Sequence, residues 1–149
     1  MTPPVFTEIT ERHLRLEELV DLVAAGSANG AVASFLGVVR DHHEGRRVVG
    51  VTYDGFKPLA EKTLAAIARE AAEKFETSVA VTHRLGRLKL REASVAIACA
   101  SAHRAAAFDA CRYVIEQVKV RLPVFKKEHY AEGKDAWLAG CSLSLPIKR

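Results

Sequence analysis

The residues best suited to chemistry in this sequence are concentrated in residues 101–128. Lys119 and Lys126 lie beside apolar residues in this segment, and His103 and Arg104 stand where a helix is expected to begin. A lysine ammonium group can stabilise negative charge or, when it is desolvated, transfer a proton. An arginine can bind a phosphate or carboxylate through two parallel hydrogen bonds, and a helix start favours anions as well. The segment therefore predicts a site that handles anionic groups.

Each of these residues also has a simpler interpretation, which the spacing alone leaves open. Lys119 and Lys126 are also consistent with surface lysines whose aliphatic stems cover apolar atoms. His103 and Arg104 are also consistent with an ordinary helix start that carries a solvated arginine.

A second polar group follows the apolar run of residues 31–39. Arg40, His42 and His43 are placed where a loop can present side chains over a pocket. The two histidines show no recognisable metal-ligand spacing with a distant Cys or Glu, so we predict no metal site. The glycines do not form a phosphate-binding loop, and no Ser-His-Asp or Cys-His set is recognisable.

The totals indicate one globular domain over residues 1–149, because 49% of the residues are hydrophobic and 27% are charged. No apolar run approaches the roughly 18–20 residues needed to span a bilayer, and the N-terminus lacks a secretory pattern. We therefore expect a cytoplasmic protein without a membrane segment. The net charge of +4 favours anionic partners. Nucleic acid is disfavoured, because no RNP-like, zinc or helix-turn-helix pattern is present.

The cysteines do not predict a disulfide framework. Cys99, Cys111 and Cys141 are odd in number and form no CxxC pair. Cys99 and Cys111 fall in apolar patterns, so we expect both to be small buried core residues.

Hydrophobic periodicity predicts an alternation of strands and helices. Helices are expected over residues 16–23, 58–75 and about 101–122, and Pro123 ends the third because it disfavours helical geometry before it. The apolar stripe predicted for the third helix is Phe108, Cys111, Ile115, Val118 and Leu122. Strands are expected over residues 5–9, 31–40, 48–53, 78–85, 93–100 and 124–128.

Two of these strands are expected to form a hairpin, in which the strand of residues 31–40 is buried and residues 48–53 return beside it. Gly37 within the first strand indicates a bulge or a close approach to the backbone. The order of elements predicts a single α+β domain with a mainly antiparallel sheet covered by helices.

Several sequence blocks together resemble the large, catalytic subunit of molybdopterin synthase. In chain order the blocks are GAVASFLGVVRDHHEGRRV, YDGFKPLAEKTL, HRLGRL, SAHRAAAFDACRYVIEQVKVRLPVFKKE and EGKDAW. The resemblance runs from about Gly30 to Trp137 and implies an α/β-hammerhead type of fold. It also implies a sulfurtransferase of molybdenum cofactor biosynthesis that requires no metal or other cofactor of its own.

The resemblance further implies the substrates and partners. A small ubiquitin-like subunit would deliver sulfur from its C-terminal glycine thiocarboxylate to cyclic pyranopterin monophosphate, and two rounds would build the dithiolene of molybdopterin. The large subunits would pair as a homodimer within a heterotetramer that carries a small subunit at each end.

Individual residues match functional positions of that family. The resemblance implies that Lys119 orients the tail of the small subunit and assists proton transfer, while Lys126 stabilises negative charge as the cyclic phosphate opens. Three further residues match positions that bind the phosphate of the pterin: Arg40, His103 and Arg104. Phe35 would form a wall of the pocket, and Arg91 departs from the family by replacing a usual glycine.

Two other functions remain as alternatives. The first is a non-catalytic partner that docks a ubiquitin-like tail without transferring sulfur, which an activity assay with the purified pair would reveal. The second is a nucleic-acid-binding domain, which would bind mixed oligonucleotides with a strong dependence on salt concentration.

Overall fold

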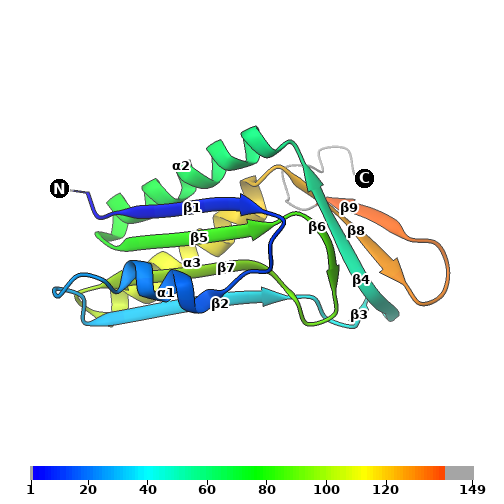
Figure 1. Ribbon diagram of the computed structural model, residues 1–149, viewed down its shortest axis with the longest axis horizontal. Helices are drawn as coiled ribbons and strands as arrows, with labels where there is room; N and C mark the ends of the chain where they lie inside the picture. Colours follow the sequence, from blue (N-terminus) through cyan, green and yellow to red (C-terminus); the bar gives the residue numbers. More distant parts are fainter. Residues whose placement is uncertain (1, 140–149) are drawn as a thin grey trace.

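The order of elements is seen in a computed structural model that describes residues 2–139 (Figure 1). The helices are α1 (Leu16–Val23), α2 (Lys57–Phe75) and α3 (Arg104–Arg121). The strands are β1 (Val5–Thr10), β2 (Ala31–Val38), β3 (His42–His43), β4 (Arg46–Gly55), β5 (Ser78–Arg84), β6 (Gly86–Lys89), β7 (Ala93–Ser101), β8 (Val124–Tyr130) and β9 (Ala136–Ala139). Cys141 and the remainder of the tail lie outside the described residues.

Proline residues define the helix ends that matter most for the site. Pro58 occupies the first turn of α2, where its missing N–H leaves no hydrogen bond unmade. Close to this turn, α3 stops at Arg121 because Leu122, which precedes Pro123, adopts extended backbone angles of −69° and 119°. The chain therefore passes directly from α3 into β8.

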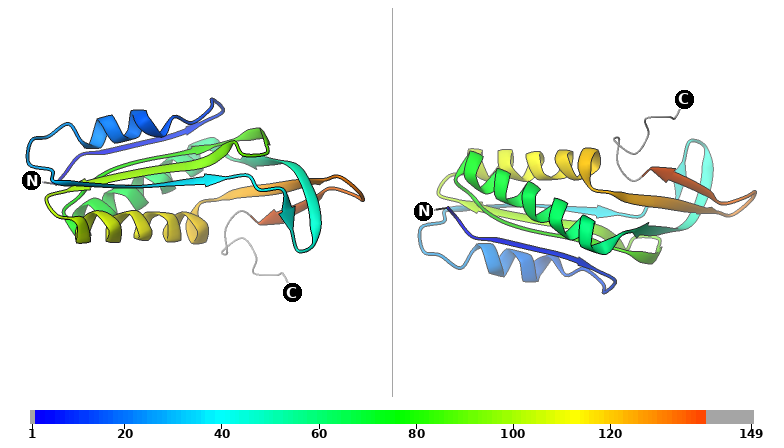
Figure 2. Two further views of the ribbon diagram at one scale, coloured as in Figure 1. Left: turned by 90° about the horizontal axis from the view of Figure 1, so that it is seen from below. Right: turned by 90° about the horizontal axis from the view of Figure 1, so that it is seen from above.

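A four-stranded sheet with the order β1-β5-β7-β2 forms the centre of the molecule. The pair β1 and β5 is parallel, and the other two pairs are antiparallel. Helices α2 and α3 cover one face of this sheet and α1 covers the other (Figure 2). Along β7, Val95, Ile97 and Cys99 pack with α2 and α3, whereas Ala96 and Ala98 pack with α1. This alternation follows from the two-residue period of a strand.

A second, antiparallel sheet lies at one end of the first and curls away from it (Figure 1). Its order is β3-β4-β8-β9, and β6 pairs with β4. In this sheet Tyr53 of β4 lies opposite Lys126 of β8. The predicted α+β class, with a mainly antiparallel sheet covered by helices, is confirmed.

The hairpin predicted between residues 31–40 and 48–53 is wrong. β2 pairs with β7 instead, and β4 pairs with β3, β6 and β8. The prediction that residues 31–40 form a buried strand is also wrong, because β2 is an edge strand and exposes most of its residues. An apolar sequence does not distinguish a strand buried within its own chain from one with an apolar surface.

The apolar stripe predicted for α3 is correct in part. Cys111 and Val118 are buried and Leu122 is fully buried, but 66% of Phe108 is exposed. The helix instead packs through smaller residues, and its buried positions are Ala107, Ala110, Cys111, Val114 and Val118. The short strands β3, β6 and β9 were not predicted: β3 and β6 lie in segments rich in glycine and charge, and β9 is an apolar run of only four residues.

Two further predictions concern the cysteines and the membrane. Cys99 and Cys111 are free thiols and both are buried, as predicted. Among residues 2–139, the structure contains no helix with the length and apolar character that crossing a membrane requires.

Candidate active site

A cavity of about 240 Å³ opens where the two sheets meet. Its walls come from the end of β2 and the segment after it, from β4, β7 and β8, and from the last turn of α3. The lining residues with ionisable side chains are Arg40, His42, His43, Tyr53, Lys119, Lys126 and Glu128. The fold thus gathers into one cavity residues from distant parts of the chain.

Lys119 reaches the cavity from the last turn of α3. Although the residue as a whole is exposed, protein atoms crowd around its ammonium group. This desolvation lowers the pKa of Lys119, and the positive charge of Lys126 lowers it further. The lowered pKa makes the amine better suited to proton transfer near neutral pH than a fully solvated lysine.

Lys126 enters the cavity from β8, just after the bend at Pro123. Side chains alternate along this strand, so Lys126 and Glu128 face the cavity while 46% of Phe125 is exposed elsewhere. The Lys126 Nζ atom lies 3.6 Å from the Glu128 Oε2 atom, and 27% of the lysine side chain is exposed. The sequence prediction that Lys126 and Phe125 point in opposite directions is consistent with this arrangement.

Glu128 is a buried acid in this cationic cavity, and sequence reasoning did not identify it. Only 5% of its side chain is exposed. Its Oε1 atom accepts a hydrogen bond of 2.7 Å from the hydroxyl of Tyr130, which raises the pKa of that tyrosine. The His43 Nδ1 atom lies 4.0 Å from Oε2. The sequence signal that could have identified Glu128 is its position two residues after Lys126 in the same strand, which places both side chains on one face.

Arg40 reaches the cavity from the segment that follows β2. Just before it, the register between β2 and β7 shifts between Gly37 and Val38, which confirms the predicted irregularity at Gly37. A Cβ atom on Gly37 would lie 2.8 Å from Val95 Cγ1, so only glycine fits there without movement of its neighbours. The bulge redirects the chain toward the second sheet.

Tyr53 and His83 form an aromatic pair next to the lysines. Their ring centroids lie 5.0 Å apart at an interplanar angle of 82°, an edge-to-face contact. His83 is buried, and its Nδ1–H donates to the carbonyl oxygen of Arg84 at 3.0 Å. Burial, with a smaller contribution from Lys119, lowers the pKa of His83 to about 4. The imidazole is therefore neutral at physiological pH.

Three residues singled out in the sequence do not line this cavity. His103 and Arg104 are exposed at the start of α3, and a helical rise of about 1.5 Å per residue separates Arg104 from Lys119 by roughly 22 Å. Phe35 lies in a separate groove between β2 and α3, beside Phe108. Within one chain, the structure therefore brings together Arg40, Lys119 and Lys126 but not these three.

The cavity has the character of an anion-binding site. Among residues 2–139, two ammonium groups and the guanidinium of Arg40 face a single carboxylate, so positive charge is in excess. Fixed cations in a partly dehydrated cavity stabilise negative charge that develops during a reaction. In the part of the chain from residue 2 to residue 139, no three His, Cys, Asp or Glu side chains are grouped to hold a metal ion.

Comparison with known sequences adds independent information. Residues 9–121 match the family described as MoaE protein. A curated relative from Pseudomonas aeruginosa is 44% identical over 128 residues, which cover 85% of each chain. A relative from Thermoplasma volcanium is 38% identical over 133 residues, which cover 89% of this chain and 96% of the relative. Both relatives are named molybdopterin synthase catalytic subunit.

Comparison with solved structures agrees. Molybdopterin synthase from Staphylococcus aureus superposes with a TM-score of 0.84 at 34% identity, covering 89% of this chain and 96% of that chain. A complex of subunits 1 and 2 of molybdopterin-converting factor from Helicobacter pylori superposes with a TM-score of 0.69 at 20% identity, covering 86% and 91%. At that identity the second comparison bears on the fold alone.

Proposed function

Because this chain belongs to the MoaE protein family, we propose that its cationic cavity performs the sulfur transfer of molybdopterin synthesis. Family membership assigns the chain to molybdenum cofactor biosynthesis as the catalytic subunit of an enzyme. The reaction converts cyclic pyranopterin monophosphate to molybdopterin, and its sulfur comes from the thiocarboxylate of a small ubiquitin-like subunit. The observation that carries the proposal is the presence of Lys119, Lys126 and Arg40 in one cavity.

The charges of the reactants fit this cavity. The substrate phosphate and the thiocarboxylate are both anionic, and the cavity carries more positive than negative side chains. Lys119 sits at the tail terminus of the small subunit, where it orients the thiocarboxylate. Its lowered pKa supports a second role, the transfer of a proton during attack on the pterin.

Lys126 stabilises the negative charge that develops as the cyclic phosphate opens. Its contact with Glu128 holds the ammonium group in place without neutralising the cavity, because Lys119 and Arg40 remain. Arg40 binds the phosphate, which its planar group of donors suits. The chemistry proposed here uses these side chains and no metal or other cofactor.

A second copy of the chain supplies the phosphate contacts that one chain lacks. The edge strand β2 exposes apolar side chains, among them Val32 and Leu36, and Phe108 exposes 66% of its surface beside it. Such a face suits a symmetric homodimer. In the proposed dimer, a twofold axis beside α3 brings the first turn of α3 in one chain near the last turn of α3 in the other chain. That arrangement would carry His103 and Arg104 toward the partner cavity, and Phe35 would lie at the shared border.

The proposed assembly is a homodimer with one small ubiquitin-like subunit bound at each end. We also propose that residues 1–149 act as a single domain and that the protein works in the cytoplasm. The cytoplasm fits the two free buried thiols, because disulfides are rare there.

A reconstitution tests the function. The purified chain is mixed with a thiocarboxylated small subunit and cyclic pyranopterin monophosphate, and the oxidised, fluorescent pterin product is quantified. The Lys119→Ala variant should lose activity by about 100-fold or more, while keeping its thermal stability, because proton transfer and charge stabilisation are both lost. Lys62→Ala, which removes an exposed lysine of α2, is the matched control and should remain active.

The outcomes separate the candidate functions. Full activity in Lys119→Ala would support the proposed enzyme activity but would assign the main catalytic role to Lys126. A stable complex of the native chain with the small subunit that yields no product would instead support the docking-only alternative. Sedimentation of the same preparation tests the homodimer, and a monomer at micromolar concentration would contradict that part of the proposal.

A further inference from the structure

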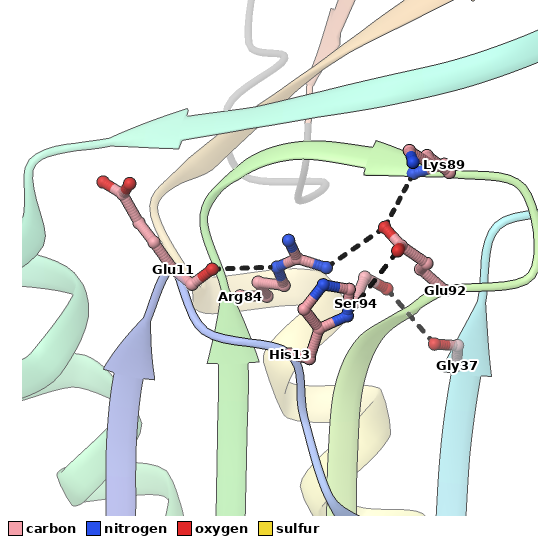
Figure 3. Close-up of polar contacts among 7 residues, drawn as sticks. All are labelled: Glu11, His13, Gly37, Arg84, Lys89, Glu92 and Ser94. Atoms are coloured by element: carbon pink, nitrogen blue, oxygen red, sulfur yellow. Dashed lines mark hydrogen bonds and ion pairs between the residues drawn. The ribbon is translucent and has the colours of Figure 1, made fainter.

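A polar network lies beside the cavity and contains none of the side chains assigned a chemical role above (Figure 3). Its centre is Arg84, the last residue of β5, which is only 8% exposed. A buried guanidinium requires partners for its donors. The Nε–H of Arg84 donates to the carbonyl oxygen of Glu11 at 3.1 Å, and Nη1 donates to Glu92 Oε1 at 3.2 Å.

Glu92 connects this arginine to the turn between β6 and β7. Its Oε1 atom also accepts a hydrogen bond of 2.9 Å from the backbone N–H of Lys89. Its Oε2 atom lies 3.6 Å from Nδ1 of His13, on the opposite side of the carboxylate (Figure 3). The Lys89 N–H is the largest cause of a lowered pKa of Glu92, to which His13 and Arg84 add. The carboxylate is therefore charged at neutral pH.

The backbone of the same turn holds the end of the strand that leads to Arg40. The N–H of Val39 donates to the carbonyl oxygen of Glu92 at 3.0 Å, and the N–H of Arg91 donates to the carbonyl oxygen of Val39 at 2.7 Å. Val39 is 6% exposed and is directly followed by Arg40, which lines the cavity. The position of Arg40 is therefore linked to the position of the turn.

The turn also holds a second wall of the cavity. Lys89 ends β6, and β6 pairs with β4 so that Lys89 lies opposite Gly50 and Gly86 lies opposite Tyr53. Tyr53 lines the cavity directly. The turn that carries Glu92 is thus bonded to the end of β2 and, through β6, to β4, and both strands line the cavity.

We propose that Arg84 and Glu92 are positioning residues, which fix the cavity end of β2 and thereby the place of Arg40 relative to the lysines. Neither residue touches the substrate. Arg84 and Glu92 hold the turn between β6 and β7, and this turn is paired with the backbone of Val39. The pairing sets the direction in which Arg40 enters the cavity and so affects substrate binding. The inference rests on the proposed function, because Arg40 is taken there to bind the phosphate of the pterin.

The test replaces Glu92 by glutamine, which keeps the shape of the side chain and removes its charge. The matched control is Glu8→Gln, because Glu8 forms an exposed ion pair of 2.8 Å with Arg12. Two quantities are measured for both variants: hydrogen exchange at the Val39 amide in the free chain, and steady-state kinetics of the complete complex with cyclic pyranopterin monophosphate.

In Glu92→Gln the amide of Val39 should exchange about 10-fold faster, and KM for the pterin should rise about 10-fold, which equals about 1.4 kcal/mol. The value of kcat should stay within about twofold, because Lys119 is carried by α3 and not by the turn. Glu8→Gln should change neither quantity. A lower melting temperature with unchanged KM and unchanged exchange would show a purely structural role and overturn the proposal, as would a loss confined to kcat.

The two proposals can fail separately. If the native complex makes no product, the proposed function fails, and the exchange rate of the Val39 amide alone decides the positioning role. If Glu92→Gln does not fold, Arg84→Lys replaces it, because lysine keeps the charge but cannot reach both Glu11 and Glu92 in the same way. That variant should raise KM about threefold, and an unchanged KM would overturn the proposal.

Discussion

The buried imidazole of His83 gives this protein a pH dependence of stability that one substitution should remove. The residue is 4% exposed, donates through Nδ1 to the carbonyl oxygen of Arg84, and has a pKa of about 4 in the folded protein. An unperturbed histidine, as in the unfolded chain, titrates near about 6.5. His83→Asn retains a side-chain N–H for the carbonyl but cannot take up a proton.

The sign of the effect follows from the direction of the shift. Because the folded state binds its proton at lower pH than the unfolded state, the contribution of His83 to stability is fully present above about pH 6.5. It is lost as the pH falls toward about 4, the value for the folded protein. Between about pH 7.5 and about pH 4.5, the loss amounts to about 2.5 kcal/mol of unfolding free energy.

Urea denaturation at these two pH values measures the effect. The unfolding free energy of the native chain should fall by about 2.5 kcal/mol more than that of His83→Asn, since all other titrating groups are common to both proteins. His103→Asn, which replaces an exposed histidine in the same way, is the matched control. An equal pH dependence in the native chain and His83→Asn would refute the reasoning, because the buried imidazole would then not be the source.

Two further predictions concern stability at other positions. Arg91 adopts a left-handed backbone conformation with φ of 71°, so Arg91→Gly should raise the unfolding free energy by about 0.5–1 kcal/mol, measured in urea; a decrease would contradict the strain. Glu70 accepts hydrogen bonds of 2.6 and 2.9 Å from Arg121, which lower its pKa. Glu70→Gln should therefore cost about 1 kcal/mol at neutral pH, a difference that shrinks as the pH falls below about 4.5, and a constant difference would count against the ion pair.

The sequence predicts well those features that depend on neighbouring residues. The end of α3 is set by Pro123 alone, and the first turn of α2 by Pro58, so both were found from the chain. Lys119 and Lys126 were found for the same reason, since the helix, the bend and the strand that place them are consecutive. The bulge at Gly37 was also local enough to predict.

Features that depend on distant partners were not predictable in this way. The apolar sequence of residues 31–40 gave no sign that β2 would lie at the edge of its sheet and pair with β7. The roles of Arg84 and Glu92 were equally hidden, because their contacts come from the segment after β1 and from the turn before β7. The distance of His103 and Arg104 from the cavity of their own chain follows from the length of α3. Their proposed contact with the phosphate depends on a second chain, which one sequence does not describe.

Because the chain bends at Pro123, the number of residues between Lys119 and Lys126 determines whether both side chains reach the cavity. One residue added within the last turn of α3 would rotate all that follows by about 100° around the helix axis. One residue added before Lys126 in β8 would turn that side chain to the opposite face of its sheet. Insertions and deletions should therefore be excluded from residues 119–126, whereas the loop of residues 131–135 between β8 and β9 can vary in length without moving either amine.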